Sequence, residues 1–307
     1  MVNAYDGVLI LADVCLLFVK IFFSILESTY RLFVPVEEKS VAGEIVLITG
    51  AGHGIGRELA LKYASLGGTV VCWDLDPQGN RETVDEVMKL GATKAHAYKC
   101  DVTNREEVFK VAERVKAEVG NVTILVNNAG IMPCQPFMDH TPEVIQKLFD
   151  VNVMAHFWML QAFLPTMITN NHGHVVALSS IAGIVGLTNV VPYCASKFAV
   201  RGLMEALTDE IKNTTGSRGS NIRFTTIYPY MVDTGLCKKP KIRFPSLMAL
   251  VPPKEAAAQI VTAQRRNYAE ASIPRHWLTV NTTFRNFPEK VWSLIKTFLD
   301  SGLEAHT

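Results

Sequence analysis

The sequence predicts an α/β fold in which helices cover both faces of a doubly wound parallel sheet. Three observations support this prediction. Short apolar runs alternate with helix-forming segments from residue 45 onward, a glycine-rich turn joins the first run to the first helix, and polar residues recur where the runs end. This alternation is typical of parallel sheets whose ligands bind beyond the carboxyl ends of the strands. We therefore expect a single domain of the Rossmann type over residues 44–275.

The composition is that of a globular protein with an apolar bias. The chain has 307 residues, of which 49% are hydrophobic and 19% charged, and its formal net charge is +1. This length is sufficient for a full core, and the near-neutral charge gives no reason to expect a nucleic-acid partner. The six cysteines are scattered without a CxxC pair. We interpret them as reduced thiols of a cytosol-facing protein and expect no metal site.

Residues 7–26 form a mostly apolar segment that is long enough to span a bilayer. Four charged residues recur at intervals of seven, two within the segment and one on either side of it: Asp6, Asp13, Lys20 and Glu27. On a helix this interval drifts by only about 20° per step, so the four residues form one polar stripe beside a wide apolar face. Such a helix suits the membrane interface. We expect residues 1–34 to be a membrane anchor; the alternative is a packing helix of a soluble oligomer.

The flanks of this segment favour an uncleaved anchor followed by a domain on the cytoplasmic side. No lysine or arginine precedes the apolar run, and no small-residue cleavage pattern is evident, in contrast to a cleaved signal peptide. Lys20, Arg31 and Lys39 favour the cytoplasmic side for the residues that follow. The polar residues 35–43 indicate a linker.

A glycine-rich turn follows the first predicted strand, Ile45–Thr49. The turn contains Gly50, Gly52, His53, Gly54, Ile55 and Gly56, and helix-forming residues begin at Arg57. Between a strand and a helix, glycines allow a tight turn and a close approach of the backbone to a pyrophosphate, which binds at the helix N-terminus. We expect a nucleotide phosphate site here. A glycine-rich turn that binds no nucleotide is the alternative.

The second predicted strand, residues 69–73, ends at Asp74. A carboxylate at this position can accept hydrogen bonds from both hydroxyls of an adenosine ribose, and its charge repels a 2′-phosphate. Leu75 follows, where a 2′-phosphate site would need arginine, and His53 in the glycine turn is mostly neutral at pH 7. These residues predict NAD rather than NADP as the cofactor.

Polar residues also follow the later strands. The predicted strand 95–100 ends at Asp101 and Val102, and the strand 122–126 runs into Asn127, Asn128, Ala129 and Gly130; the helices before them are expected over 77–91 and 104–119. With Thr49, Asp74 and Ser180, these residues mark one edge of the sheet, where a ligand is expected. Asn152 lies near the start of a long helix predicted over about 150–170, where its apolar surround also fits a core amide.

Tyr193 and Lys197 lie four residues apart in a predicted helix, so their side chains share one face about one turn apart. A lysine cation favours the phenolate, and we expect it to lower the pKa of Tyr193 enough for proton exchange with an alcohol or carbonyl. Ser180, thirteen residues upstream of the tyrosine, follows Ser179 at the end of an apolar run. Its hydroxyl could bind the same substrate oxygen. Tyr-x-x-x-Lys also occurs in helices without this role, so the preceding strand ends give the pair its weight.

The residues after the predicted strand 221–227 mix apolar and basic side chains. They include Leu236, Lys238, Lys239, Lys241, Arg243, Phe244, Leu247, Met248, Leu250 and Val251. The alternatives are a solvated loop and a substrate lid whose basic rim meets anionic lipid head groups. A helix is expected over 254–267. Residues 276–307 form an amphipathic extension with an apolar stripe at Val291, Leu294, Ile295, Phe298 and Leu299, which packs on the core, caps a cleft or rests on a bilayer.

The glycine turn, the Asn127–Gly130 segment, Asn152, Ser180 and the Tyr193/Lys197 pair, in this order, resemble the short-chain dehydrogenase/reductase superfamily over roughly residues 40 to 275. The resemblance implies an NAD-dependent oxidoreductase that transfers hydride between an alcohol and nicotinamide. In such an enzyme Tyr193 is the general acid/base, Ser180 positions the substrate oxygen, and Lys197 lowers the tyrosine pKa and binds the nicotinamide ribose. Asn152 would hold a water, Asp101 and Val102 would bracket the adenine, Asn128 would lie near the adenosine-side ribose, and Thr234 would contact the carboxamide.

Residues 43–56, 155–158 and 171–174 are similar to lipid-droplet 17β-hydroxysteroid dehydrogenases of types 11 and 13, with epidermal retinal dehydrogenases as near relatives. Residues 229–235 are similar to a membrane-bound all-trans-retinol dehydrogenase. This implies attachment to the endoplasmic reticulum membrane or a lipid droplet, a lipophilic retinol-type alcohol as substrate, and a homodimer formed through the helices 104–119 and 153–170. A 17β-hydroxysteroid dehydrogenase and a non-catalytic lipid-droplet surface protein are the alternatives. Tyr230 departs from the pattern, because many members have glycine there.

Overall fold

A computed structural model describes residues 4–91, 94–237, 239–245, 248–300 and 302–305. Lys238 and Leu247 of the predicted lid lie outside the described residues. The chain divides into two compact units, Met1–Lys39 and Ser40–Thr307.

The first unit is built on one long helix, α1 (Ala4–Phe33). Its segment Asp6–Arg31 is long and apolar enough to cross a membrane, and none of the segment is buried against protein. The charged stripe is exposed, and Glu27 at its end lies 3.8 Å from Arg31. Among the described residues, the other segment that passes the same test is Pro142–Thr169, half of which is buried in the second unit.

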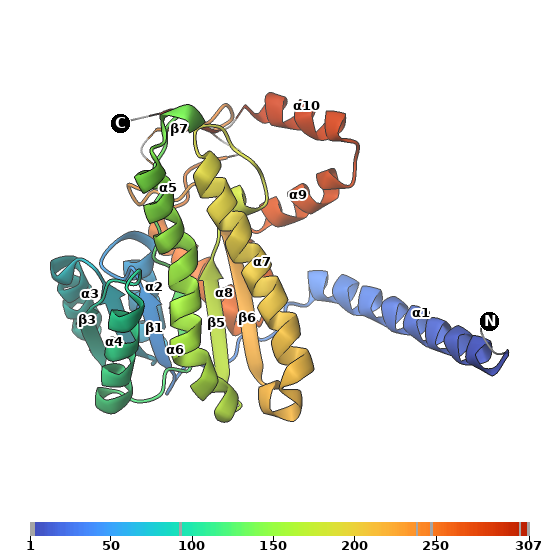
Figure 1. The fold of residues 1–307 in the computed structure, drawn as a ribbon, viewed down its shortest axis with the longest axis horizontal. Helices are drawn as coiled ribbons and strands as arrows, with labels where there is room; N and C mark the ends of the chain where they lie inside the picture. Colours follow the sequence, from blue (N-terminus) through green and yellow to red (C-terminus); the bar gives the residue numbers. More distant parts are fainter. Residues whose placement is uncertain (1–3, 92–93, 238, 246–247, 301, 306–307) are drawn as a thin grey trace. The chain divides into compact units, whose positions relative to one another are not determined.

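The second unit contains a seven-stranded sheet in the order β3-β2-β1-β4-β5-β6-β8, and every neighbouring pair is parallel (Figure 1). The strands are β1 (Ile45–Thr49), β2 (Thr69–Asp74), β3 (Ala95–Lys99), β4 (Ile124–Asn127), β5 (Gly173–Leu178), β6 (Ile222–Pro229) and β8 (Glu270–Ile273). The order reverses between β1 and β4, which creates the switch point where doubly wound sheets bind ligands. The predicted fold class is confirmed.

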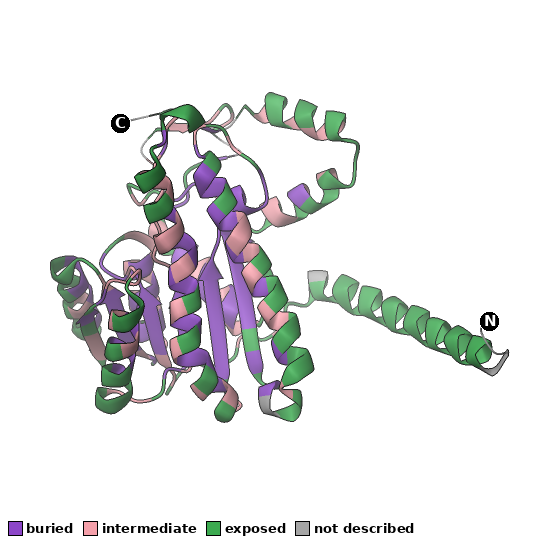
Figure 2. Ribbon diagram, viewed as in Figure 1, coloured by how far each residue is buried: buried purple, intermediate pink, exposed green. Residues whose placement is uncertain are grey.

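Helices cover both faces of the sheet because alternate strand residues point to opposite faces. Val46 and Ile48 of β1 join a core with α2 (Gly54–Ser65), α3 (Pro77–Lys89) and α8 (Pro253–Arg265). Leu47, between them, joins a second core with α4 (Arg105–Glu118), α6 (Ala155–Thr169) and α7 (Val191–Thr214). Both sides of the central strands are therefore buried, as Figure 2 shows by their colour, whereas the edge strand β3 has one buried residue.

Several elements add detail to those expected from the sequence, and α10 falls within the predicted amphipathic extension 276–307. The short helix α5 (Pro142–Phe149) runs into one π-helical turn, Asp150–Met154, before α6 begins, and this turn carries Asn152. At the C-terminal end, α9 (His276–Arg285) and α10 (Glu289–Leu299) lie together beyond the ends of the strands (Figure 1). A small antiparallel pair, β7 (Pro240–Lys241) and β9 (Gly302–Leu303), ties the predicted lid region to the C-terminal residues.

Candidate active site

A cavity of about 690 Å³ opens at the carboxyl ends of the central strands. It is lined by residues that directly follow β1, β2, β3, β4, β5 and β6, and by α9 and α10. Of the predicted site residues it brings together Gly50, His53, Gly54, Ile55, Gly56, Asp74, Asp101, Val102, Asn128, Ala129, Gly130, Ser180, Tyr193, Lys197 and Thr234. The two that do not line it are Gly52 and Asn152, which lie behind the wall.

The glycine turn brings the N-terminus of α2 to the cavity. A Cβ atom at Gly56 would lie 2.0 Å from the carbonyl oxygen of Gly50, so only glycine permits this close packing of helix on turn. The N-cap residue, His53, makes no side-chain hydrogen bond to the first turn of the twelve-residue helix. The turn is therefore open to a ligand, and the first-turn N–H groups of a helix attract anions.

Asp74 is fixed beside the glycine turn by two backbone hydrogen bonds. Its Oδ2 accepts from the N–H of Gly52 at 2.7 Å, and its Oδ1 accepts from the N–H of Asp76 at 2.9 Å. A Cβ atom at Gly52 would lie 2.9 Å from Oδ2 and would push the carboxylate away. Gly52 thus acts through Asp74, which still has acceptor capacity toward the cavity.

Asn128 and Asp101 both have local structural roles. The Asn128 amide donates to the carbonyls of Thr49 at 2.8 Å and Gly50 at 3.2 Å, which braces the glycine turn against the end of β4. Asp101 accepts from both the N–H and the hydroxyl of Thr103, at 2.9 and 2.7 Å, and so closes the turn after β3. Both residues line the cavity, but each has contacts that sequence reasoning did not predict.

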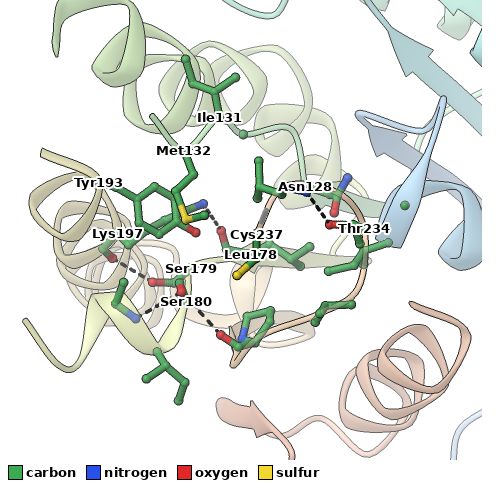
Figure 3. A pocket seen from close by; sticks show the side chains of 18 of the residues that line it. Asn128, Ile131, Met132, Leu178, Ser179, Ser180, Tyr193, Lys197, Thr234 and Cys237 are labelled. Atoms are coloured by element: carbon green, nitrogen blue, oxygen red, sulfur yellow. Dashed lines mark hydrogen bonds between the residues drawn. The ribbon is translucent and has the colours of Figure 1, made fainter. Parts of the chain in front are cut away.

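The side chains of Ser180, Tyr193 and Lys197 converge at one wall of the cavity (Figure 3). Tyr193 and Lys197 lie one turn apart in α7, with the lysine Nζ 5.6 Å from the centre of the tyrosine ring. The Ser180 hydroxyl is hydrogen-bonded to Tyr193. Ser179 is turned away, and its hydroxyl donates to the backbone carbonyl of Lys197 at 2.8 Å. The geometry therefore distinguishes the two serines in favour of Ser180.

Lys197 and Asn152 are held by backbone atoms around the switch point. The lysine Nζ donates to the carbonyl of Leu178, at the end of β5, at 2.8 Å. The Asn152 amide accepts from the N–H of Ile131 and donates to its carbonyl, both at 2.9 Å, and it also donates to the Ser196 hydroxyl at 3.1 Å. Asn152 is fully buried. The π-helical turn sets its position, and no periodic pattern in the sequence reveals such a turn.

Burial shifts the titration of both groups on α7. It raises the pKa of Tyr193 to about 12, while the hydrogen bond with Ser180 lowers it and the Cys194 and Cys237 thiols raise it. Burial also lowers the pKa of Lys197 to about 8. The direction for Tyr193 is opposite to the one expected from the sequence, because loss of solvation on burial is the largest influence on the phenol. In the protein alone the phenol is therefore protonated at neutral pH.

The other end of the cavity is lined mainly by large apolar side chains, of which Tyr230 and Leu299 were singled out from the sequence and Trp277 and Trp292 were not. Tyr230, which follows β6, stacks on Trp277 of α9 with ring centres 5.4 Å apart. From α10 the cavity receives Trp292, Lys296 and Leu299. The predicted stripe on this helix is thus offset: Leu294 and Phe298 are 63% and 61% exposed. The spacing 292, 296, 299 was a usable signal, but the lysine within it obscured the pattern.

A dinucleotide-type switch point with a convergent serine, tyrosine and lysine defines an α/β oxidoreductase that uses a nicotinamide cofactor. Comparison with known proteins assigns the family. The model of the family described as short chain dehydrogenase matches residues 44–242, about two thirds of the chain. The protein therefore belongs to the short-chain dehydrogenase family, which confirms the resemblance stated from the sequence.

Curated relatives include retinol and steroid dehydrogenases. The chain is 46% identical over 244 residues to epidermal retinol dehydrogenase 2 of Homo sapiens, covering 80% of this chain and 78% of the relative. It is 45% identical over 234 residues to 17-beta-hydroxysteroid dehydrogenase 13 of Homo sapiens, covering 76% and 77%. Both are consistent with the relatives named from the sequence.

Solved structures share the fold. A short-chain dehydrogenase/reductase from Burkholderia phymatum in complex with NAD has a TM-score of 0.72 and 25% identity, over 81% of this chain and 95% of that one. A metagenomic short-chain oxidoreductase in complex with NADP has a TM-score of 0.63 and 27% identity, over 76% and 97%. These neighbours support a nicotinamide cofactor and leave the choice between NAD and NADP to the residues of this chain.

Proposed function

We propose that this protein is an NAD-dependent alcohol dehydrogenase that transfers hydride between a lipophilic alcohol and nicotinamide at a membrane or lipid-droplet surface. The observation that supports it best is the convergence of Ser180, Tyr193 and Lys197 on a cavity that begins at an uncapped helix N-terminus and ends between aromatic side chains. The first end suits a dinucleotide, and the second suits an apolar substrate.

The residues at the dinucleotide end fit NAD. The α2 N-terminus would receive the pyrophosphate, and Asp74 would accept hydrogen bonds from the adenosine ribose. Leu75 is exposed at the cavity rim, where a 2′-phosphate would require a cation. Gly54 lets Thr234 pack closely against the glycine turn, since a Cβ atom at Gly54 would lie 3.0 Å from that of Thr234. Asp101 and Val102 would bracket the adenine, and Thr234 would meet the carboxamide.

The chemistry of the chain's own residues follows from their positions. Tyr193 would take the proton of the substrate hydroxyl in oxidation and return it in reduction, and Ser180 would hold the same oxygen through its hydroxyl. Lys197 would donate to a ribose hydroxyl and stabilise the phenolate, while Asn152 orders the backbone at Ile131 and could hold a water beside the lysine. When bound, NAD supplies the hydride acceptor and a positive charge beside the phenol, which lowers the pKa that burial has raised.

The proposed location rests on two apolar surfaces, each described within its own unit. The apolar residues of α1 have no protein contact that buries them, and a charged stripe beside a wide apolar face suits an interfacial helix. In the second unit, α10 leaves Leu294 and Phe298 exposed, and the Arg243 guanidinium lies 5.6 Å from the Phe298 ring centre. Exposed apolar groups next to a cation suit an anionic lipid surface. We propose the endoplasmic reticulum membrane or a lipid droplet, with the catalytic domain in the cytoplasm.

We also propose a homodimer that forms through the outer surfaces of α4 and α6.

The substrate is either a retinol-type alcohol or a 17β-hydroxysteroid, and both classes suit the aromatic end of the cavity. A non-catalytic role at the lipid surface is disfavoured because Lys197 is buried and its charge is costly, as its lowered pKa indicates. A scaffold would gain stability by replacing such a lysine with an apolar residue.

The test is turnover by membrane-bound wild-type protein and its Tyr193→Phe variant, followed by NADH absorbance with a panel of lipid alcohols. We expect wild-type turnover with NAD and a loss of about 10²–10⁴-fold in the variant, because phenylalanine cannot exchange a proton. Nucleotide binding, followed by tryptophan fluorescence, should be unchanged. Cys237→Ala, which alters a cavity residue without a hydroxyl, is the matched control and should retain activity. Residual activity of Tyr193→Phe near the wild-type level would exclude this mechanism.

A further inference from the structure

A buried amide without a described partner lies in the apolar part of the cavity. Asn281 of α9 lines the cavity, and its side chain is only 5% exposed. Its amide nitrogen, Nδ2, has no hydrogen-bond partner among the residues that the structure describes. Although Asn281-Thr282-Thr283 matches a glycosylation motif, its burial excludes it as an acceptor.

The surroundings of Asn281 make an unpartnered amide costly. Trp277, four residues earlier on the same helix face, stacks on Tyr230, and Trp292 of α10 lines the same part of the cavity. A polar group buried among apolar side chains without a hydrogen bond costs about 1–3 kcal/mol. Groups of this kind in a native cavity point to a ligand or a water that completes the bond.

Asn281 and the reacting groups line the same cavity and are connected through the aromatic pair. The Ser180 hydroxyl donates to the carbonyl of Pro229 at 3.4 Å, and the next residue, Tyr230, contacts Trp277. Asn281 is a further turn along α9, about 6 Å of helix rise. A substrate that reaches from Ser180 past the aromatic pair would therefore place its opposite end near this amide.

We propose that Asn281 is a specificity-determining residue that donates a hydrogen bond to a second oxygen of the substrate. The preferred substrate class is then a lipophilic alcohol with a keto or hydroxyl group at the end opposite the reacting carbon. A 17β-hydroxysteroid with an oxygen at C3 has this pattern, whereas retinol ends in a hydrocarbon ring. This inference rests on the proposed function and narrows it from lipophilic alcohols to those with two oxygen functions.

Tyr230 and Lys296 also bring polar atoms to this part of the cavity, and Lys296 does not substitute for Asn281. Its ammonium donates to the carbonyl of Gly186 at 2.9 Å, and the residue is exposed. An exposed, flexible cation discriminates weakly between a keto group and solvent. A buried amide with an unmet donor discriminates strongly, because a substrate that lacks the oxygen leaves the donor unpaired.

The test compares wild-type protein with Asn281→Leu on matched substrates, a 17β-hydroxysteroid with a 3-keto or 3-hydroxyl group and its 3-deoxy analogue, with retinol as a third alcohol. For wild type we expect kcat/KM to be at least tenfold higher with the oxygenated steroid. In Asn281→Leu we expect a loss of about 10- to 100-fold with that steroid and a change below threefold with the other two alcohols. Thr282→Val, an exposed neighbour on the same helix that does not line the cavity, is the control and should match wild type.

Ligand binding gives a readout that does not depend on turnover. The affinity for a 3-keto steroid that lacks the 17-hydroxyl can be measured by quenching of Trp277 and Trp292 fluorescence. This affinity should be about tenfold or more lower in Asn281→Leu, while the melting temperature of the variant should stay within a few degrees of wild type. Equal losses with oxygenated and deoxygenated substrates, or an unchanged preference, would overturn the inference and indicate that the amide holds a structural water. If wild type turns over no alcohol yet the binding difference is present, the proposed function fails and the inference stands.

Discussion

Replacement of Asp74 by serine together with Leu75 by arginine is expected to convert the nucleotide preference from NAD to NADP. Asp74 is fixed at the end of β2 by the N–H groups of Gly52 and Asp76, so its carboxylate cannot move aside to admit a 2′-phosphate. Leu75 is 61% exposed at the cavity rim, which leaves space for a longer cation. The double variant therefore removes a repulsive charge and supplies an attractive one at the same position.

The magnitude follows from two contributions. Loss of a charge-assisted hydrogen bond to the adenosine ribose costs about 1.5–3 kcal/mol, or roughly 10- to 100-fold in kcat/KM for NAD. Removal of the repulsion between Asp74 and a 2′-phosphate gains about 1–2 kcal/mol for NADP, because the carboxylate is partly exposed and screened. The ratio of the two specificity constants should then shift by about 10²–10³-fold.

The assay measures kcat/KM with each nucleotide at a saturating concentration of one lipid alcohol, and nucleotide affinity by tryptophan fluorescence. Asp76→Asn is the control: it removes a nearby charge, but asparagine still caps α3, as Asp76 does through the N–H groups of Gln78 and Gly79. This control should change the ratio less than threefold. A wild-type preference for NADP, or a double variant that keeps the wild-type ratio, would refute the reasoning.

Two further predictions concern the buried lysine and the N-terminal helix. Burial lowers the pKa of Lys197 to about 8, so between pH 8 and 10.5 the unfolded chain binds a proton that the native protein has released. In urea unfolding, the free energy of unfolding of wild type should therefore rise by about 3 kcal/mol relative to that of Lys197→Met as the pH increases through this window. Parallel pH profiles of the two proteins would contradict the burial argument. Charges on the apolar face of α1, away from the charged stripe (Leu11→Asp, Phe18→Asp and Ile25→Asp), should release the protein from vesicles in a flotation assay, since an aspartate costs about 2.5–3.5 kcal/mol in the hydrocarbon core of a bilayer. Glu27→Gln should still float, and flotation of the triple variant would exclude α1 as the anchor.

Much of the fold could be predicted because each strand of the central sheet is a separate apolar run. Leu47 and Val71 face one core while Val46 and Ile48 face the other, so the strands are apolar on both sides and stand out from the polar turns. The eighth strand was less visible, because Glu270 and Ser272 interrupt its four residues. The π-helical turn around Asn152 was invisible, since a single extra residue in a helix leaves no periodic signal.

The candidate site was predictable at its nucleotide end, where polar residues at the ends of parallel strands must share one edge of the sheet. It was harder to predict which of two adjacent residues at a strand end contacts the ligand and which has a structural role. Asn128 braces the glycine turn, and Ser179 binds the carbonyl of Lys197, and both facts depend on side-chain directions that spacing alone does not give. The sign of the Tyr193 pKa shift also depends on burial, which the spacing of Tyr193 and Lys197 does not reveal.

The residues at the two ends of the cavity are held in position by different parts of the structure. This difference explains why one end could be predicted from the sequence and the other could not. At the reactive end, side chains are held by backbone atoms of the sheet: Lys197 by the carbonyl of Leu178, and Asn152 by both groups of Ile131. At the substrate end, the walls are side chains of α9 and α10, which lie outside the sheet and carry Trp277, Asn281 and Trp292 into the cavity. Substitutions there can change the substrate while the reactive groups keep their positions. The identity of the substrate should therefore depend on these two helices, and Asn281 is the polar group at which the dependence can be measured.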